Sequence, residues 1–333
     1  MKQPHLILGI GELLWDILPA DPRLGGVSLQ GSLSAPEPPA AEPVRVALLG
    51  GAPANFTVMA GRLGNHAVML SRIGRDDLGR MAVDKLDPMP VDASVLQVDS
   101  GQPTGRVTVE FVRGEPRYTI HQPAAWDFLE LSDDWVRLAE RADAICFGSL
   151  AQRRAAARRT IQQLAAATAA RCIRIFDVNL RPPFISGEVI QESLGLATVV
   201  KMNQDELPQV LQLLGFPAEQ TASRSDLRFG AARLLAEFPS LQMVALTRGS
   251  RGSLLVTRDE WHDHPGFPVK MADGIGAGDA FTAALAHYML RGAPLATLNE
   301  AGNRWGGWVA SQSGAMPALP DDARQAIAAA IEQ

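Results

Sequence analysis

Short β-rich apolar runs alternate with longer helical patterns from about residue 142 onward, and this alternation constrains the fold more than any other feature. The periodic stretches predict helices near 155–170, 204–215, 226–237, 278–291, 297–311 and 321–332. The apolar runs predict strands at 143–148, 172–178, 197–202 and 242–247. Strands separated by helices pair in parallel, and a parallel sheet needs helices on both of its faces. The pattern therefore predicts an α/β fold with a mostly parallel sheet between two helical layers.

The N-terminal part is expected to extend the same sheet. It carries a predicted strand at 5–10, a helix that begins near Pro53 and ends by Gly64, a strand at 67–73, and a helix from about Asp77. With 333 residues, 47% of them hydrophobic, the chain is long enough to bury one large core. We expect a single domain spanning residues 1–333, with a small insert.

The insert is predicted by strict alternation of apolar and polar residues. Residues 106–111 alternate, residues 113–116 form a turn, and residues 117–121 return, which is typical of a β-hairpin. The hairpin could cover the active site or extend a sheet edge, and the pattern favours neither. We interpret it as a small β lid built from segments near 12–50 and 100–123. Residues 20–45 hold five prolines and little periodicity, so a loop is expected there, with 32–43 peripheral.

Charge and cysteine content exclude several classes of partner. The net charge is -5, and the 31 Lys and Arg residues are scattered, so we expect no nucleic-acid or membrane partner. Cys146 and Cys172 lie in apolar runs without metal-site or disulfide spacing, which is typical of a cytoplasmic protein. Glu12 and Asp16 interrupt the apolar N-terminus, which makes a poor signal peptide or membrane span.

The most informative motif is a glycine-rich turn that leads directly into an amphipathic helix. Gly274, Gly276 and Gly278 precede this helix, so backbone N–H groups and the positive helix end could together bind phosphate oxygens. No Lys-Ser or Lys-Thr follows the turn, which excludes a Walker loop. A dinucleotide fingerprint would follow the first strand, so an oxidoreductase is disfavoured. The turn therefore predicts phosphate binding by a different motif.

Asp279 lies inside this turn, where a carboxylate would repel the phosphate that the turn attracts. It could be a general base that accepts the proton of an attacking hydroxyl while the turn stabilises a transferring phosphoryl group. It could equally be a favoured residue of the first helical turn. Spacing alone leaves both interpretations open.

Several separated motifs, in order, give the chain a resemblance to a known family over nearly its whole length. They are Gly9-Ile-Gly-Glu-Leu-Leu-Trp-Asp-Ile-Leu-Pro19, Gly50-Gly-Ala-Pro-Ala-Asn55 with Gly61-Arg-Leu-Gly64, Arg72-Ile-Gly-Arg-Asp76 with Gly79, Asp177-Val-Asn-Leu-Arg181, Lys201-Met-Asn-Gln-Asp-Glu206, Thr247-Arg-Gly-Ser-Arg-Gly252, and Asp273 through Ala283. The chain resembles the ribokinase-like (PfkB) carbohydrate kinases, and specifically their fructokinase-like branch. In the last motif the family more often has Thr-Thr where this chain has Gly274-Ile275. The segment between Pro19 and Gly50 is also longer than usual, which bears on the rim of the sugar pocket.

The resemblance implies the roles of the catalytic and sugar-binding residues. Asp279 would be the base, and the amides of Gly276, Ala277 and Gly278 would form the anion hole. The implied sugar-binding residues are Asp16, Gly51, Asn55 and Arg181. A carboxylate and an amide can bind several hydroxyls of a polyol, and a Gly-Gly turn lets the backbone approach closely.

The resemblance also implies the nucleotide site. The residues expected around ATP are Asn179, Asn203, Glu206, Thr247, Gly249, Gly252 and Asn303. Glu206 would act on Mg²⁺ through water, because Mg²⁺ keeps much of its hydration shell. K⁺ activation is frequent in the family, and here it would involve the backbone near Asp273 and Ile275 and the turn from Ser313 to Ala318.

Taken together, these features predict an ATP-dependent kinase that phosphorylates a sugar hydroxyl, with fructose as the first candidate. The rivals within the class are kinases for 2-keto-3-deoxygluconate, ribose or a nucleoside. A sugar acid would need cationic contacts, for which the lid offers Arg106, Arg113 and Arg117, and relatives differ near His121 and Gln122 according to substrate. A catalytically silent sugar sensor should have lost Asp279 or the glycine turn. The resemblance further implies a homodimer formed through the β lid.

Overall fold

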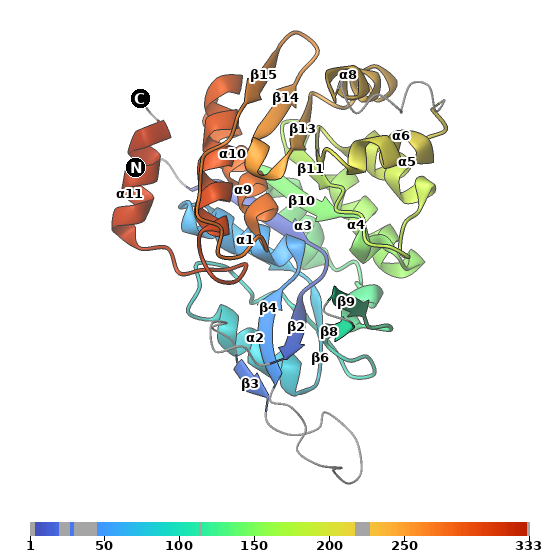
Figure 1. Ribbon diagram of the computed structural model, residues 1–333. Helices are drawn as coiled ribbons and strands as arrows, with labels where there is room; N and C mark the ends of the chain where they lie inside the picture. The colour runs from blue at the N-terminus through green and yellow to red at the C-terminus, as the bar shows by residue number, and fades with distance from the viewer. Residues whose placement is uncertain (1–3, 20–26, 30–44, 113–114, 217–226, 332–333) are drawn as a thin grey trace.

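A computed structural model describes the chain except for residues 1–3, 20–26, 30–44, 113–114, 217–226 and 332–333 (Figure 1). Its main sheet has eight strands in the order β15-β14-β13-β12-β11-β10-β1-β5. The strands are β1 Leu6–Ile10, β5 His66–Leu70, β10 Ala144–Gly148, β11 Ile173–Asp177, β12 Val199–Asn203, β13 Met243–Thr247, β14 Ser253–Val256 and β15 Trp261–His264. All pairs from β5 to β13 are parallel, and β14 and β15 add an antiparallel edge.

Helices cover both faces of this sheet. The α-helices are α1 Ala52–Arg62, α2 Asp77–Leu86, α3 Asp133–Arg141, α4 Ala155–Ala167, α5 Gly187–Leu196, α6 Glu206–Leu213, α8 Leu227–Glu237, α9 Ala277–Met289, α10 Leu295–Ala310 and α11 Asp321–Ile331. Short 3-10 helices are η1 Ala125–Phe128, η2 Leu150–Gln152 and η3 Gly249–Arg251. Buried residues of α3, α4, α5, α6 and α8 belong to one core, and those of α9, α10 and α11, with most of α1, to the other.

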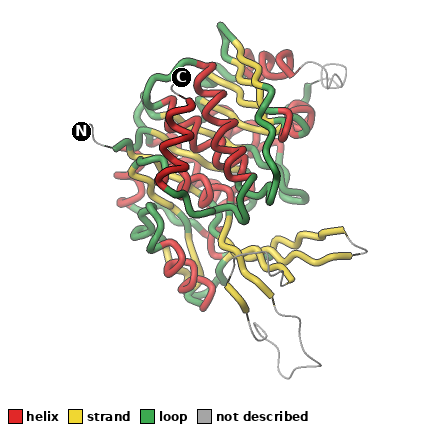
Figure 2. The backbone as a smooth tube through the Cα atoms, turned by 60° about the vertical axis from the view of Figure 1, so that its left-hand side comes forward, coloured by secondary structure: helices red, strands yellow, loops and turns green. Residues whose placement is uncertain are grey.

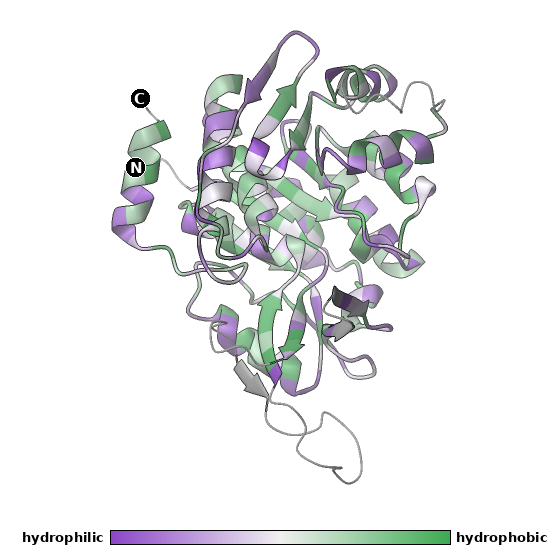
Figure 3. Ribbon diagram, in the orientation of Figure 1, coloured by the Kyte–Doolittle hydropathy of each residue, from purple (hydrophilic) through white to green (hydrophobic). Residues whose placement is uncertain are grey.

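Successive side chains along a strand point to opposite faces of the sheet and so belong to the two cores in turn. In β1, Leu8 and Ile10 belong to the α4 side, whereas Ile7 belongs to the α9 side. Phe147 and Phe176 stack across β10 and β11 with ring centroids 5.6 Å apart. Full burial of one such side chain contributes roughly 1.5–3 kcal/mol. Figure 3 shows apolar residues concentrated on the central strands and polar residues on the outer helix surfaces.

A second sheet projects from the main body (Figure 2). Its order is β3-β4-β2-β8-β9, with β2 Leu14–Pro19, β3 Val27–Leu29, β4 Arg45–Gly50, β8 Gly105–Val112 and β9 Glu115–Ile120. It shares a third core with α2 and with the side of α1 that carries Ala54 and Val58. A two-stranded parallel sheet, β6 Arg72–Gly74 with β7 Gln97–Asp99, lies beside it.

Most predicted elements are present within one to three residues of their expected ends, and the hairpin is confirmed as β8 and β9, although its turn includes undescribed residues. Two predictions need correction. The strand expected at 67–73 breaks at Ser71, whose hydroxyl donates to Gly11 O at 2.6 Å, and residues 72–74 pair in the small sheet rather than the main one. The loop expected at 20–45 contains β3, while its 32–43 portion lies outside the described residues. The segment near 12–50 that was expected in the β lid supplies β2, β3 and β4 to the same sheet as β8 and β9. Sequence patterns missed α3, α5 and the short strands β7, β14 and β15.

Candidate active site

The candidate site lies at the carboxyl edge of the main sheet. Strand β1 pairs in parallel with β5 on one side and with β10 on the other, so the connections after β1 and β10 diverge. Ligands of open α/β sheets bind in the crevice that such a reversal of strand order creates. The loops that follow β1, β11, β12 and β13 carry the motifs singled out above.

Asp279 and Asn55 meet at this edge. Asn55 Nδ2 donates to Asp279 Oδ2 at 2.7 Å, joining the first turns of α1 and α9. Asn55 is 6% exposed and its Oδ1 has no hydrogen-bond partner among the described residues. Asp279 is partly buried. A buried amide acceptor beside a carboxylate suits a hydroxyl, which donates and accepts at once.

The surroundings of Asp279 prepare it to exchange a proton. Burial raises its pKa to about 6, and the Asp177 carboxylate adds to this effect, while Lys201, the Asn55 hydrogen bond and Arg181 oppose it. A carboxyl with this pKa is mostly ionised at neutral pH but is a stronger base than an exposed aspartate. A carboxyl with this pKa is compatible with general-base chemistry.

The glycine turn before α9 has the form expected of an anion site. Gly276 is the residue before the helix and has φ 78°, and a Cβ there would lie 2.7 Å from Ala315 O. The first amides of a helix lack partners within the helix, so those of Ala277 and Gly278 are available to a bound anion. Asp273 braces the turn by accepting from Ile275 N at 3.0 Å and from Gly314 N at 3.3 Å. The turn thus packs directly against the 313–318 segment.

Asp16 and Gly51 lie on the side of the second sheet. Asp16 is on β2, and burial raises its pKa to about 6, with Arg181 lowering it and Asp273 raising it. A Cβ on Gly50 would lie 3.0 Å from Asp16 Oδ2. Gly51 has φ 108°, and a Cβ there would lie 2.3 Å from Glu12 O, so only glycine fits. Asp16, Gly51, Asn55 and Asp279 are therefore brought into one region.

Arg181 is the cation that faces these carboxyls. Its side chain is exposed, with Nη1 donating to its own neighbour Leu180 O at 3.1 Å. Its charge lowers the pKa of Glu12, Asp16 and Asp279. Asn179, two residues earlier, has φ 42°, the only positive φ among the described non-glycine residues. This left-handed residue turns the chain after β11 toward the site.

A buried ion pair under the glycine turn was not assigned a role from the sequence. Lys201 Nζ lies 3.1 and 3.0 Å from the two oxygens of Asp177, and Thr282 Oγ1 donates to the same carboxylate at 3.0 Å. A Cβ on Gly278 would lie 2.9 Å from Lys201 Nζ. The sequence signal that could have revealed this ion pair is Lys201, a charged residue within the otherwise apolar strand at 199–202. The pair places a cation directly beneath the anion-binding turn.

Asn203 and Glu206 form a reciprocal cap at the start of α6. Asn203 Oδ1 accepts from Glu206 N at 2.9 Å, and Glu206 Oε2 accepts from Asn203 N at 2.8 Å. Glu206 Oε1 accepts from Leu180 N at 2.8 Å, which ties the loop after β11 to the loop after β12. Burial raises the pKa of Glu206, and these amides and Lys201 oppose that effect. Asn203 and Glu206 thus lie beside Asn179 at the same sheet edge.

Thr247, Gly249 and Gly252 lie at the loop after β13. Thr247 ends the strand, and its carbonyl accepts from Gln204 N at 2.9 Å. Gly249 has φ 60° and is exposed. Gly252 has φ 77°, and a Cβ there would lie 2.0 Å from His264 O. The glycine at 252 is needed because the chain passes directly against β15.

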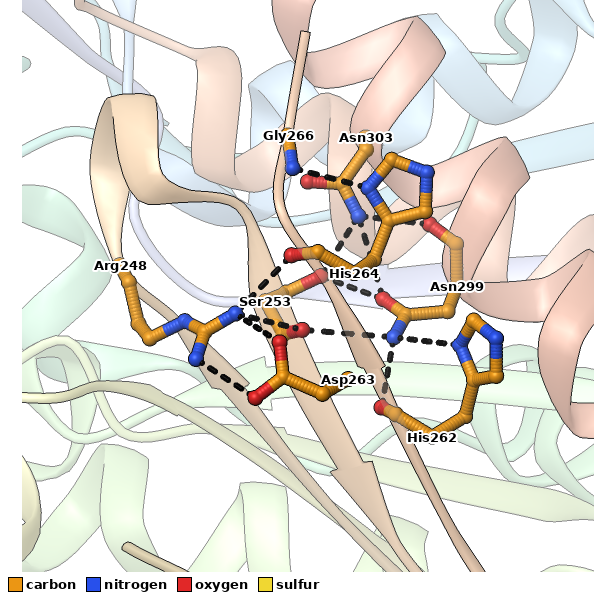
Figure 4. A network of polar contacts seen from close by, with 8 residues as sticks. All are labelled: Arg248, Ser253, His262, Asp263, His264, Gly266, Asn299 and Asn303. Atoms are coloured by element: carbon orange, nitrogen blue, oxygen red, sulfur yellow. Dashed lines mark hydrogen bonds and ion pairs between the residues drawn. The ribbon is translucent and has the colours of Figure 1, made fainter.

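Asn303 belongs to a network that joins α10 to β14 and β15 (Figure 4). Its Nδ2 donates to Ser253 Oγ and to Asn299 O, both at 2.7 Å. Asn299 Nδ2 donates to His262 O at 2.8 Å, and Ser253 Oγ contacts Asn299 Oδ1. Arg248, paired with Asp263, extends the network to the loop after β13. The amide of Asn303 is therefore engaged within the protein, near that loop.

Among the residues that the structure describes, no helix is long and apolar enough to cross a membrane, and no three His, Cys, Asp or Glu side chains gather into a metal-binding cluster.

The chain is similar to known carbohydrate kinases in both sequence and fold. Residues 26–322 match the family described as pfkB family carbohydrate kinase. A fructokinase of Klebsiella pneumoniae is 30% identical over 294 residues, covering 84% of this chain and 91% of the relative. The structure of a sugar kinase from Pyrococcus horikoshii in complex with ATP is 27% identical, with a TM-score of 0.75 over 95% of this chain and 96% of that one.

The fold itself is shared with a fructokinase structure from Xylella fastidiosa with bound ATP, at 22% identity and a TM-score of 0.78 over 98% of this chain and 99% of that one. The predicted ribokinase-like α/β architecture is confirmed by these structural neighbours. Because the family match spans most of the sequence and includes both glycine motifs, this chain belongs to the pfkB family of carbohydrate kinases and is a sugar kinase.

Proposed function

We propose that this kinase transfers the γ-phosphoryl group of ATP to a hydroxyl of a neutral sugar, with fructose as the preferred acceptor and fructose phosphate as the product. The observation that carries the proposal is the Asn55–Asp279 contact at the start of α9, beside a turn suited to binding an anion. The likeness to the Klebsiella pneumoniae fructokinase supports fructose as the acceptor.

In this proposal Asp279 removes the proton of the attacking hydroxyl. Asn55 Nδ2 holds one carboxylate oxygen, so the other oxygen would face the sugar. The amides of Gly276, Ala277 and Gly278 would stabilise charge on the transferred phosphoryl group, and the Lys201 ammonium beneath Gly278 would add to that field. Asp16 and Gly51 would hold the remaining hydroxyls. The hydroxyl oxygen then attacks phosphorus, the bond to the ADP oxygen breaks, and Asp279 keeps the proton.

The balance of charge favours a neutral sugar over a sugar acid. The positive charge of Arg181 acts on three carboxyls at once and lowers the pKa of Glu12, Asp16 and Asp279. A substrate carboxylate would add a further negative charge to this set and would meet repulsion from it. Arg106 lies near His121, whose pKa is lowered by burial and by that arginine, and Arg113 lies outside the described residues. A neutral polyol instead pairs its hydroxyls with the carboxylates.

The nucleotide would lie over the loops after β12 and β13, where Asn179, Asn203, Thr247, Gly249 and Gly252 gather, with Asn303 acting through the network behind them. Glu206 fits a role in Mg²⁺ binding through water, because a carboxylate has about four acceptor positions and two are taken by backbone amides. Bound Mg²⁺ would neutralise phosphate charge. K⁺ would fit near the carbonyls of Asp273, Ile275 and the 313–318 turn, which Asp273 draws together.

Substrate identity is tested by measuring ADP production with fructose, ribose, 2-keto-3-deoxygluconate and inosine side by side. We expect the highest kcat/KM with fructose and dependence on Asp279 with every accepted sugar. The Asp279→Asn variant serves as the background in each assay. A higher kcat/KM for the sugar acid would overturn the charge argument, and a higher value for ribose or inosine would overturn the fructose assignment while leaving the kinase assignment intact.

We also propose that two copies associate through the second sheet, as a lid shared between protomers. Strand β9 is an edge strand of this sheet, and Tyr118 on it is 63% exposed. An open edge with an exposed aromatic side chain invites pairing with another chain. Light scattering should give twice the chain mass, and Tyr118→Lys should lower it. An unchanged dimer mass in that variant would place the interface elsewhere.

A further inference from the structure

Glu12 is a buried carboxyl to which no role in this site has yet been given. It directly follows β1 and Gly11, and it is 3% exposed. Burial raises its pKa to about 7, Asp279 repels it, and Arg181 attracts it. Its Oε2 has no hydrogen-bond partner among the described residues. Burying such a group is costly, so its retention at the centre of the site needs a physical reason.

The reason lies at the start of α1. This helix has Gly51 as its N-cap, without a side-chain cap, and no acidic residue in its first turn. Pro53 has no N–H, which leaves Ala52 as the first helical donor that needs an acceptor. The backbone N–H groups of Ala52 and of Glu12 itself lower the pKa of the Glu12 carboxyl, and a Cβ on Gly51 would lie 3.3 Å from Glu12 Cγ, so this side chain lies at the start of α1. It thus supplies from another element a hydrogen-bond acceptor that the start of the helix lacks.

The backbone of Glu12 also lies close to the turn before α1. A Cβ on Gly51 would lie 2.3 Å from Glu12 O and 3.3 Å from Glu12 Cγ. Farther along, α1 is fixed by packing, since a Cβ on Gly9 of β1 would lie 1.8 Å from Thr57 Oγ1. Adjustment is therefore confined to the first turn, where Asn55 N donates to Gly51 O at 2.9 Å.

We propose that Glu12 is a positioning residue for the base: by capping α1 through Ala52, it sets the place of Asn55 and, through the Asn55 amide, the orientation of Asp279. This inference rests on the proposed role of Asp279 but requires no particular sugar. The effect of such a cap depends on the length of the side chain. A side chain that ends where Glu12 ends can accept from Ala52, and one that is a methylene shorter cannot.

Two substitutions separate reach from charge. Glu12→Gln keeps the length and an acceptor oxygen but removes the charge, whereas Glu12→Asp keeps the charge and shortens the side chain. Measured with the best accepted sugar at saturating ATP, kcat should stay within about 3-fold of the parent in Glu12→Gln and fall by about 10-fold or more in Glu12→Asp. The KM for ATP should change little in both, because Ala52 and Asn55 lie on the sugar side.

Ser132→Ala is the matched control, because Ser132 caps α3 by accepting from Trp135 N at 3.3 Å, away from the site. It should lower the melting temperature without changing kcat. The positioning role is wrong if kcat is retained in Glu12→Asp, or if kcat falls further in Glu12→Gln than in Glu12→Asp. Should Glu12→Asp fail to fold, full activity in Glu12→Gln still supports a capping acceptor, and its loss refutes one. Failure of the base assignment would appear separately, as an active Asp279→Asn variant.

Discussion

Asn55 and Asp279 are 224 positions apart in the sequence, yet Asn55 Nδ2 lies 2.7 Å from Asp279 Oδ2. The contact joins the first turns of α1 and α9, each preceded by a glycine with a positive φ. It places the side chain expected to bind sugar directly against the side chain expected to remove a proton. Both glycine motifs thus serve a single site.

Asp279→Asn should lower kcat by about 10²- to 10⁴-fold, the usual contribution of general-base assistance. Asparagine preserves the size of the side chain but cannot accept the proton of the sugar hydroxyl. Steady-state ADP production at saturating sugar and ATP measures the effect, and ATP affinity should be retained or should rise. Turnover within a few-fold of the parent would mean that Asp279 is only a helix-cap residue.

The same variant should gain stability relative to the parent as pH rises. The pKa of Asp279 in the folded protein is raised from 3.8 to about 6, so its favourable contribution is complete below 3.8 and is lost as pH rises through about 6. The difference in melting temperature, variant minus parent, should therefore be more positive at about pH 8 than at about pH 5. The opposite trend would indicate that the Asp279 carboxylate is stabilised by the fold.

Asn55→Leu should shift the acidic limb of the pH profile of kcat to higher pH. The Asn55 hydrogen bond lowers the pKa of Asp279, which lies at about 6 with this bond in place, and activity requires the ionised form. Rate profiles at saturating sugar measure the shift. Asn65→Ala is the control, because Asn65 is a buried asparagine that bonds Ala60 O at the far end of α1. An unmoved limb in Asn55→Leu would show that another group governs the acid side.

Gly276→Ala should reduce both kcat and stability. Alanine at φ 78° is strained by about 1–3 kcal/mol, and its Cβ would lie within 2.7–2.9 Å of Ala315. Gly274→Ala is the matched control, because a Cβ there meets nothing within 4 Å. It should keep kcat and melting temperature close to those of the parent. Equal effects of the two substitutions would argue against a specific role of the turn geometry.

Asp16→Ala should raise the KM for sugar by about 5- to 100-fold, the range expected when a hydrogen-bonded charged acceptor is removed. The KM for ATP should stay within about 2-fold, because β2 lies on the side of the second sheet. The ATP titration of the same variant is the internal control. A comparable rise in both constants would place Asp16 outside the sugar pocket.

Local sequence was sufficient to predict the elements whose hydrophobic pattern and length indicate the same type of secondary structure. The strands at β1, β10, β11, β12 and β13 and the helices α4, α6, α8, α9 and α10 follow periodicity that residues close in sequence create. The glycine turn before α9 could likewise be located from the sequence, because its glycines and the helix that follows them are adjacent in the chain. The short strands of the second sheet were not, since three- to six-residue strands are stabilised by partners far along the chain.

The site shows the same division. Asp279 could be named from its motif, but the choice between base and cap depends on its hydrogen bond with Asn55 and on the charges of Asp177 and Lys201, which come from other elements. Glu12 appeared in the sequence only as a charge that interrupts an apolar run. The capping of α1 that we propose for Glu12 is possible because the end of β1 and the turn at Gly51 meet in space. Burial, pKa and cross-element hydrogen bonds are properties of the packed chain, since they depend on which distant groups exclude water from each residue.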